Sequence, residues 1–498
     1  MSIKVVKFGG SSLADAEHFR KVAAIVKADP TRRYVVPSAP GKRFSNDVKV
    51  TDMLYTCYQM IREKKSMQEV DEYYKNITER YDSIIRELGL DFDLSGEYEY
   101  IKNAMLHRPG RDYVASRGEY LSGLILAKYL GFPFIDAENV IFFKENGSFD
   151  QEKTDRVLSA ELAQFRHAVI PGFYGCAANG TVKTFSRGGS DITGSIVARA
   201  AGATLYENWT DVSGFLMADP RIIENPRPID TITYRELREL SYMGATVLHE
   251  DAIFPVRVAG IPINIRNTNN TASRGTMIVP RTDMYDTRSI ITGVAGKKGF
   301  SVLSIEKAMM NSETGFGRKV LEAIEKEGIS FEHLPSSIDS MCVILNTHEI
   351  EECRERIVNR ICATTHPDYI AIEDGLALIA VVGRAMVKAK GTAYRVFKAC
   401  AESDINIKMI DQGSSELSIL VGVDSGDFQS AIRAIYNPAI THPWAHFSTN
   451  VVTFSVDFFD RALNAGCMLN GYRPVTLDEL IENNMRFRWE CVSEEERL

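Results

Sequence analysis

The sequence predicts an α/β protein in which a three-layer α/β/α domain is followed by two ferredoxin-like βαββαβ units. Two observations support this prediction. Up to about residue 283, short β-branched runs alternate with helical patterns, which is typical of a largely parallel sheet covered by helices. Beyond that point, a pattern of helix, strand, turn and strand occurs twice, so that Gly391 repeats Gly315 after 76 positions.

The first domain is expected to build its sheet from five short runs. They are Val5–Phe8, Tyr34–Pro37, Ala168–Pro171, Thr204–Tyr206 and Ile263–Arg266. Residues 51–106 interrupt this alternation and predict a helical excursion, because they are polar, periodic and nearly free of glycine and proline. Methionine, tyrosine and isoleucine residues keep helical spacing there, and we expect them to pack in the core rather than to bind a ligand.

The repeat predicts the elements of the two later units. Each copy has a strand (Ser301–Ile305 and Leu376–Val381), a helix (Gly317–Glu327 and Ala393–Ser403) and another strand (Ile329–Leu334 and Ile405–Ile410). A polar turn, a further strand (Met341–Leu345 and Leu417–Val421) and a last helix (Glu349–Ile361 and Ser425–Ile435) follow. This order matches a ferredoxin-like βαββαβ unit.

The chain therefore divides into four predicted parts: 1–283, 290–366, 374–440 and a C-terminal extension, 441–498. The extension keeps aromatic residues and a capping-box pattern at Thr476 and Glu479, so it is not expected to be wholly disordered. Its two histidines, His442 and His446, flank Pro443, which favours a loop over a helical metal site. No function follows from this part.

Composition and charge exclude several classes of protein. The 498 residues are 45% hydrophobic and 25% charged, as in ordinary globular proteins, and the net charge of -8 argues against nonspecific nucleic-acid binding. The 8 cysteines form no Cys-x-x-Cys pair, so neither a disulfide framework nor a zinc site is expected. No apolar run approaches the ~18 residues of a membrane span, and no signal peptide precedes the first strand, so a cytoplasmic enzyme is expected.

The first candidate site is the turn after the first strand, where Lys7 is followed by Gly9, Gly10, Ser11 and Ser12. The strand carries an ammonium group to its carboxyl end, and the glycines allow a ligand to approach the backbone closely. Ser11 or Ser12 is expected to cap the next helix, whose N-terminus suits an anion. The pattern is not the GxxxxGK[ST] phosphate loop, and taken alone it is explained better as an ordinary strand-to-helix turn.

Two later turns make an anion site the better interpretation. A second glycine pair opens a helical run of small residues, with Arg187 before the pair and Asp191 after it. An arginine fork matches a carboxylate or a phosphate. A third turn, Trp209–Arg221, combines a potential helix cap at Thr210 and Asp211 with a glycine and a late arginine. The turn with Lys7 and the turn with Arg187 and Asp191 together predict a site for an anionic substrate beside a polyphosphate.

These motifs resemble the signature set of aspartate kinases, which belong to the amino-acid kinase superfamily and carry tandem ACT domains. The resemblance covers about the first 440 residues and rests on Lys7–Ser12, Ser116–Glu119, Arg187–Asp191, Thr210–Val212, Asp219–Arg221, Gly244–Ala245, Val247–His249 and Ile265–Thr268. It implies transfer of the γ-phosphoryl group of ATP to the side-chain carboxylate of L-aspartate, which gives 4-phospho-L-aspartate. This is the first step of lysine, threonine and methionine biosynthesis.

The resemblance also implies the roles of single residues. Lys7 would stabilise charge on the moving phosphoryl group and Asp191 would orient Lys7, with no strong base, because the aspartate carboxylate is already ionised at neutral pH. Arg187 would bind the substrate carboxylate and Glu119 its ammonium group. The other implied contacts are Ser38, Thr51, Phe173 and Ser190 for the substrate, and Lys7, Gly9, Gly10, Ser11, Thr210, Asp211 and Arg221 for ATP. Mg²⁺ would be held largely by phosphates and water, without a protein metal cage.

Some of these residues have simpler explanations. Taken alone, Asp191, Ser38 and Thr51 are explained as helix caps, and Glu119 as an acid in the first turn of a helix. Near the nucleotide, Leu216 replaces a tyrosine that is frequent in the family, and Thr246 replaces a frequent lysine. Loss of one charge would weaken ATP binding by ~1–3 kcal/mol, so we expect an active enzyme with altered nucleotide affinity.

The repeats resemble ACT domains, which are small amino-acid-sensing modules. Family analogy implies an effector, threonine or lysine, bound where two such units meet edge to edge, and a homodimer or higher oligomer formed through them. The candidate effector residues are Met310, Ser330, Glu332, Ser336, Ser337 and Asp339. Ile338 replaces an acid found in lysine-sensitive relatives, which weakens the argument for lysine.

Two other functions stay open. One is another amino-acid kinase, such as a glutamate kinase, although the tandem repeats and Ser116–Glu119 favour aspartate. The other is a non-catalytic amino-acid sensor with a decayed nucleotide site, which is suggested by Leu216 and Thr246. A fused homoserine dehydrogenase is not expected, because no GxGxxG pattern opens a βαβ unit after residue 440.

Overall fold

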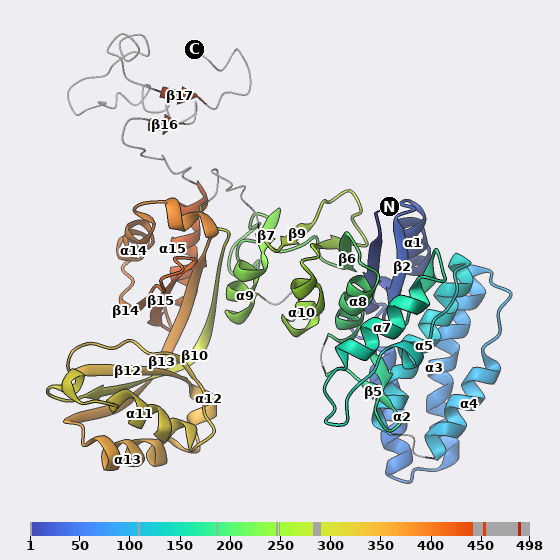
Figure 1. Ribbon diagram of the computed structural model, residues 1–498, viewed down its shortest axis with the longest axis horizontal. Coiled ribbons are helices and arrows are strands. Elements are labelled where there is room, and N and C mark those ends of the chain that lie inside the picture. Colours follow the sequence, from blue (N-terminus) through green and yellow to red (C-terminus); the bar gives the residue numbers. More distant parts are fainter. Residues whose placement is uncertain are drawn as a thin grey trace. The chain divides into compact units, whose positions relative to one another are not determined.

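A computed structural model describes residues 2–107, 110–186, 188–245, 248, 250–281, 290–441, 452–454 and 487–489 (Figure 1). They form two compact units. The first comprises Met1–Pro220 and Asn225–Asp283, and the second comprises Arg221–Glu224 and Met284–Leu498. The predicted α/β class is confirmed in both, whereas the division into 1–283, 290–366, 374–440 and 441–498 stays a prediction. Within 441–498, two short strands, β16 (Val452–Phe454) and β17 (Phe487–Trp489), pair in parallel, and most of the remainder lies outside the described residues.

The first unit is built on a seven-stranded sheet with the order β3-β2-β1-β6-β8-β9-β7. Its strands are β1 (Lys4–Phe8), β2 (Arg32–Pro37), β3 (Ala168–Val169), β6 (Leu205–Thr210), β7 (Thr231–Thr233), β8 (Ile263–Asn267) and β9 (Thr276–Val279). The five strands predicted from the sequence, β1, β2, β3, β6 and β8, run parallel to one another. Their carboxyl ends therefore lie along one edge of the sheet. A separate ribbon is formed by β4 (Tyr174–Cys176) and β5 (Val182–Thr184).

Helices cover both faces of this sheet. They are α1 (Ala16–Lys27), α2 (Val50–Arg62), α3 (Met67–Leu88), α4 (Ser95–Leu106), α5 (Arg111–Leu130), α6 (Ala137–Val140), α7 (Gln151–Leu162), α8 (Gly189–Ala200), α9 (Tyr234–Tyr242) and α10 (Glu250–Ala259). Val6 and Phe8 of β1 share a core with α1 to α5, which includes the predicted helical excursion, now seen as α2, α3 and α4. Lys7 points to the opposite face, where it meets α8, because successive side chains of a strand alternate between faces.

The predicted cap of the first helix is wrong. Ser11 and Ser12 lie in a short 3-10 turn, η1 (Gly10–Leu13), which separates them from α1. The cap of α1 is Asp15, whose carboxylate accepts a hydrogen bond from the His18 backbone N–H at 3.0 Å. Ser12 instead shares a buried 2.7 Å hydrogen bond with Thr268.

Thr210 and Asp211 do not cap a helix either. β6 ends at Thr210, and the next described helix is α9, which is capped by Thr233 in a capping box with Glu236. The intervening chain forms an antiparallel pairing in which the Met217 N–H donates to a backbone carbonyl near Pro228. The sequence pattern failed here because it marks a strand end and a turn, not a helix start.

The second unit is built on a six-stranded antiparallel sheet with the order β11-β12-β10-β13-β15-β14. Its strands are β10 (Gly293–Glu306), β11 (Phe331–His333), β12 (Ser340–Asn346), β13 (Tyr369–Val382), β14 (Ile407–Asp411) and β15 (Ser418–Asp424). Its helices and 3-10 turns are η2 (Met310–Ser312), α11 (Phe316–Glu325), α12 (Thr347–Ile350), α13 (Arg354–Thr365), η3 (Arg384–Lys388), α14 (Thr392–Glu402) and α15 (Phe428–Thr441). Every strand predicted from the repeat is present, and so is every helix, except that the predicted helix Glu349–Ile361 is divided between α12 and α13.

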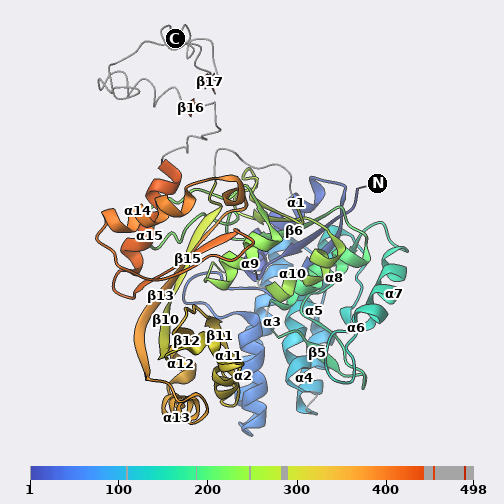
Figure 2. The ribbon, with the colours of Figure 1, turned by 60° about the vertical axis from the view of Figure 1, so that its left-hand side comes forward.

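The two repeats exchange strands through β10 and β13, which each span 14 residues and lie side by side (Figure 2). Phe300–Glu306 pairs with β12 on one side and with the first half of β13 on the other. Gly293–Lys298 pairs with Ala377–Val382, whose other neighbour is β15. The second repeat thus takes its fourth strand from residues that precede the first repeat. The sequence repeat could not reveal this, because the exchanged strand lies outside the repeated text.

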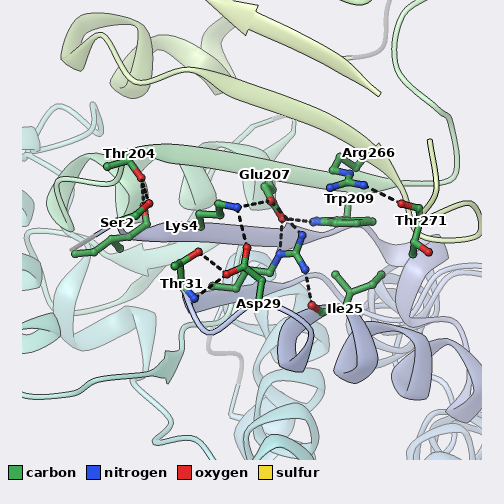
Figure 3. A network of polar contacts seen from close by, with 12 residues as sticks. Ser2, Lys4, Ile25, Asp29, Thr31, Thr204, Glu207, Trp209, Arg266 and Thr271 are labelled. Carbon is green, nitrogen blue, oxygen red and sulfur yellow. Dashed lines mark hydrogen bonds and ion pairs between the residues drawn. The ribbon is translucent and has the colours of Figure 1, made fainter. Parts of the chain in front are cut away.

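A buried ionic network ties β1, β2 and β6 together on the face that α1 covers (Figure 3). Glu207 of β6 accepts a 2.8 Å hydrogen bond from Arg32 Nε and a 2.9 Å hydrogen bond from the Trp209 indole N–H. The Lys4 ammonium group lies 3.8 Å from Glu207 and 2.8 Å from Asp29. The side chains of Arg32 and Glu207 are only 8% and 2% exposed, so each charge depends on the other for compensation.

We expect Glu207→Ala to destabilise the first unit by about 3–5 kcal/mol, because it leaves the Arg32 guanidinium buried without its countercharge. Urea denaturation would measure the loss. As a control, Glu79→Ala removes one partner of the Lys75–Glu79 pair, whose side chains are 71% and 61% exposed, and should cost less than about 1 kcal/mol. If both variants lose the same free energy of unfolding, the buried network is not a specific source of stability.

Candidate active site

Lys7 and Asp191 form the centre of the candidate site. Lys7 is buried near the end of β1, and its ammonium group lies 2.6 Å from Asp191 Oδ1, in the first turn of α8. Asn208 is the β6 partner of Lys7 in the parallel register, and its Nδ2 donates to the same carboxylate oxygen at 2.8 Å. Asp191 is not the helix cap, since Gly188 takes that position with a left-handed φ of 59°. The carboxylate therefore orients the lysine at the carboxyl edge of the sheet.

Gly9 and Gly10 bring the backbone close to this lysine. The Gly9 N–H donates to the Trp209 carbonyl at 3.0 Å, which fixes the turn to β6. A Cβ atom on Gly9 would lie 3.6 Å from Lys7 Nζ, and one on Gly10 would lie only 2.9 Å from the Ala39 carbonyl oxygen. A side chain at Gly10 would thus push away the loop that follows β2. The half-buried Ser11 follows in η1.

Glu119 is a buried acid on α5, and its Oε2 atom has no hydrogen-bond partner among the described residues. Burial raises the pKa of this carboxyl group to about 8, although the Ala39 backbone and the charges of Lys7 and Arg117 act in the opposite direction. A buried carboxyl group with an unpaired oxygen is suited to receive a cationic group from a ligand.

Glycine at position 118 lets Glu119 approach the sheet edge. A Cβ atom there would lie 2.8 Å from the Ala39 Cβ and 3.8 Å from Thr51 Oγ1. Thr51 lies in the first turn of α2, and the Ser38 N–H extends the sheet by donating to the Phe8 carbonyl at 3.0 Å. Two substrate residues expected from the sequence, Ser38 and Thr51, thus flank the segment against which Glu119 packs.

The residue before β4, Phe173, lies against the first turn of α8. Its φ is 82°, a left-handed value that is rare for a bulky side chain and persists only where the surroundings fix it. The Phe173 N–H donates to Thr193 Oγ1 at 3.0 Å. A Cβ atom on the preceding Gly172 would lie 2.7 Å from the Ser190 Cβ, so this loop and the start of α8 are in close contact.

The residues expected to bind the nucleotide are only partly brought together. Thr210 is half-buried at the end of β6 and donates to the exposed Asp211 carboxylate at 3.0 Å. Leu216 is 38% exposed and pairs with Pro228. Arg221 is exposed and falls in the segment grouped with the second unit, so the geometry of the first unit does not include it. Arg187 and Thr246 lie outside the described residues.

The expected effector residues form a neighbourhood in the first repeat. Met310 is buried in η2, and the preceding Met309 N–H donates to Asp339 Oδ1 at 2.8 Å. A second link joins the Asn311 N–H to the Ile338 carbonyl at 3.0 Å. The remaining candidates lie on β11 or beside it; Ser330, Ser336 and Ser337 are exposed and Glu332 is half-buried.

Comparison with known proteins assigns the chain to a family. The amino acid kinase family model matches residues 2–267, which is more than half of the chain. Aspartokinase 3 of Bacillus subtilis is 39% identical over 459 residues, which cover 87% of this chain and 98% of that protein. The chain belongs to the amino acid kinase family, in its aspartokinase branch.

Solved structures and a second family model agree with this assignment. The aspartate kinase of Clostridium acetobutylicum is 49% identical, with a TM-score of 0.80, and the match covers 89% of this chain and 100% of that one. Aspartokinase III of E. coli, solved with aspartate and ADP, has a TM-score of 0.66 at 24% identity and covers 88% of this chain and 99% of that one, which supports the fold alone. An ACT domain model matches residues 379–438, in the second repeat.

No described helix combines the length and apolar character needed to cross a membrane. Likewise, no group of three or more His, Cys, Asp and Glu side chains in the described part of the chain is arranged to hold a metal ion.

Asn208 is a member of the site that the sequence interpretation missed. It is a buried amide between Glu207 and Trp209 in β6, and it lies just beyond Thr204–Tyr206, the strand expected from the sequence. The signal that could have found it is its place directly across from Lys7. That signal requires the register of β1 and β6, and sequence patterns do not give the register of parallel strands that lie about 200 residues apart.

We expect Glu119 to make the affinity for the amino-acid substrate depend on pH. Only the ionised carboxylate can pair with an ammonium group, so KM for aspartate should fall by up to about tenfold between about pH 7 and about pH 9. Steady-state kinetics at saturating ATP would measure this profile. Glu119→Gln keeps the shape but not the charge, and should give a high KM with a flat profile. A Gln variant with the wild-type profile would contradict this role.

Proposed function

We propose that this chain transfers the γ-phosphoryl group of ATP to the side-chain carboxylate of L-aspartate and so forms 4-phospho-L-aspartate. The observation that carries the proposal is the contact set of Lys7, Asp191 and Asn208 beside the buried Glu119, in a chain of the aspartokinase branch. The site offers a cation for a phosphoryl group and a buried carboxyl group for an ammonium group. The product would enter the biosynthesis of lysine, threonine and methionine.

The reaction requires no strong base. A carboxylate oxygen of aspartate attacks the γ-phosphorus, an O–P bond forms, and the bond between that phosphorus and the β–γ bridging oxygen breaks, so that ADP leaves with the electron pair. No proton is transferred. Catalysis therefore depends on position and charge, and Lys7 is the residue that would neutralise charge on the moving group. Asp191 and Asn208 would hold the ammonium group in place.

The amino acid would be bound at both of its ends. Glu119 would bind the α-ammonium group, because its unpaired oxygen lacks a partner in the described residues. Arg187 is proposed for the α-carboxylate by family resemblance. Ser38, Thr51, Phe173 and Ser190 would line the remainder of the substrate site. Ser38 and Phe173 lie on loops beside Glu119 and α8, and Thr51 and Ser190 lie in the first turns of α2 and α8.

The nucleotide phosphates would lie over the turn that contains Gly9, Gly10 and Ser11. Thr210 and Asp211 stand beside this turn at the end of β6, and Arg221 is proposed by resemblance. Both contacts of Asp191 Oδ1 are already made by protein groups. Mg²⁺ would be held mainly by phosphates and water, and it would neutralise phosphate charge when bound.

The second unit is proposed to sense an amino acid and to join copies of the chain. Supporting this, an ACT domain model matches the second repeat, and a relative from E. coli has been solved with lysine. The neighbourhood of Met310, Ser330, Glu332, Ser336, Ser337 and Asp339 is the proposed effector site. A cytoplasmic location is proposed as well, in agreement with the free cysteines among the described residues.

Lys7→Ala is expected to lower kcat for aspartate phosphorylation by at least about 100-fold, with little change in folding, because the lysine acts on transition-state charge. A hydroxamate assay for acyl phosphate, run with a panel of amino acids, would measure it. The panel also separates aspartate from glutamate as substrate. As a control, Lys75→Ala removes an exposed lysine of α3 and should be neutral. Near wild-type kcat in Lys7→Ala would contradict the assignment.

We expect at least one of the amino acids lysine, threonine and methionine, tested singly and in pairs, to inhibit the enzyme by binding the second unit. Inhibition requires the effector to prefer an inactive state, and a coupling of ~1–3 kcal/mol would suffice. Calorimetry and initial rates would measure binding and inhibition together. Asp339→Asn should weaken binding of the effector without changing the rate measured in its absence. If none of these amino acids gives a heat of binding or inhibits the enzyme, the sensing role is contradicted, and the repeats would serve only to join copies of the chain.

A further inference from the structure

A buried arginine on α3 is bonded directly to both loops that flank the candidate site. Arg80 is 4% exposed and lies in the helical excursion. Its Nε donates to the Ala14 carbonyl at 3.2 Å and its Nη2 to the Gly41 carbonyl at 2.6 Å. Its Nη1 donates to Asp47 Oδ2 at 2.8 Å. One planar guanidinium group thus joins three separate points of the chain.

Those points belong to the loops that carry the proposed chemistry. Ala14 ends the turn that begins at Gly9 and bears the proposed phosphate contacts. Gly41 and Asp47 lie in the loop between β2 and α2, which starts at Ser38. The two loops also touch, because the Gly41 N–H donates to the Gly10 carbonyl at 2.8 Å. Arg80 therefore fixes the distance between the phosphate turn and the start of the substrate pocket.

The carboxylate that receives Arg80 has a second, outer arginine. Arg43 binds Asp47 through Nε at 2.8 Å and Nη2 at 3.0 Å, but its side chain is 43% exposed, against 3% for Arg80. The two arginines hold the pKa of Asp47 well below its usual range. Among the described residues, Arg43 forms its hydrogen bonds with Asp47 and not with Ala14 or Gly41. The pair therefore offers a matched comparison between an inner and an outer guanidinium group on one acid.

The residue next to Arg80 is bonded to the helix that carries Glu119. Tyr81 is fully buried and its hydroxyl donates to the Gly118 carbonyl at 2.7 Å, one residue before Glu119. Neighbouring side chains of α3 thus contact the phosphate turn, the β2–α2 loop and the helix of Glu119.

We propose that Arg80 is a positioning residue for phosphoryl transfer, which keeps the Gly9–Ala14 turn and the Ser38–Asp47 loop in one fixed arrangement. The inference rests on the proposed function. The arrangement is stabilised by the N–H donors of the guanidinium group, whose fixed planar geometry matches the carbonyl and carboxylate acceptors. A lysine cannot reproduce this geometry. Because the reaction depends on placing two anions against Lys7, a small displacement of either loop should slow it.

Three variants test the proposal. Arg80→Lys keeps a charge beside Asp47 and most of the volume, but loses the fork, and should lower kcat by about 10- to 100-fold. Arg80→Met should lower it at least as far. Arg43→Met, the matched control, should stay within about twofold of wild type. Thermal unfolding of each variant is recorded alongside. A lowered Tm with unchanged kcat and KM in Arg80→Lys would overturn the proposal, since that is the signature of a purely structural residue.

Hydrogen–deuterium exchange gives a readout that does not depend on turnover. In Arg80→Lys, exchange should rise in Gly9–Ala14 and Ser38–Asp47 and stay unchanged in β8. Unchanged exchange in the two loops would overturn the proposal. If the wild-type protein does not phosphorylate aspartate at all, the proposed function fails, and the exchange data still decide whether Arg80 fixes the loops.

Discussion

The parallel pairing of β1 with β6 is the constraint on which the site depends. It sets Lys7 beside Asn208 and Phe8 beside Trp209. The first pair faces α8 and holds Asp191, whereas the second pair faces the core of α1 to α5. Because side chains alternate, a slip of one residue would turn the lysine into the core and the phenylalanine toward the site. Catalytic geometry and core packing are therefore fixed by the same register.

The two faces of these strands treat charge differently. On the core face, Glu207 is enclosed by Arg32 and the Trp209 indole, so its charge is satisfied within the protein. On the opposite face, Asp191 of α8 is bound on one oxygen, and Glu119 of α5 keeps an unpaired oxygen. The charge of Glu207 is thus satisfied within the protein, whereas Asp191 and Glu119 retain capacity for a ligand. Such an incomplete set of contacts is costly for stability and is typical of functional sites.

The sequence predicted much of the fold, because hydrophobic periodicity and the repeat report local structure directly. The five parallel strands, the helical excursion and the elements of both repeats were all found in this way. Lys7 and Asp191 were also predicted, since glycine turns mark them. The exact caps were wrong where a 3-10 turn intervened, as at Ser11. Asn208 was missed because its role depends on strand register.

Arg80 and the strand exchange escaped for a related reason. Arg80 is one charged residue in a polar helical pattern, and nothing local separates it from a solvated arginine. Its three acceptors lie 33 to 66 residues away in the chain. Gly293–Lys298 likewise pairs with Ala377–Val382 across the whole first repeat. Contacts of this range are decided by tertiary packing and leave no periodic trace in the sequence.

The exchanged strand has a consequence for how the chain matures during synthesis. Gly293–Lys298 leaves the ribosome well before Ala377–Val382. Its backbone N–H and C=O groups on that side therefore stay unpaired while the first repeat is synthesised. The loop between the two segments is long and therefore closes slowly. Until it closes, the unpaired strand edge can pair with other chains. A fragment that ends after the first repeat would contain Gly293–Lys298 without the strand that pairs with it. A fragment that begins at the second repeat would leave one edge of its sheet uncovered.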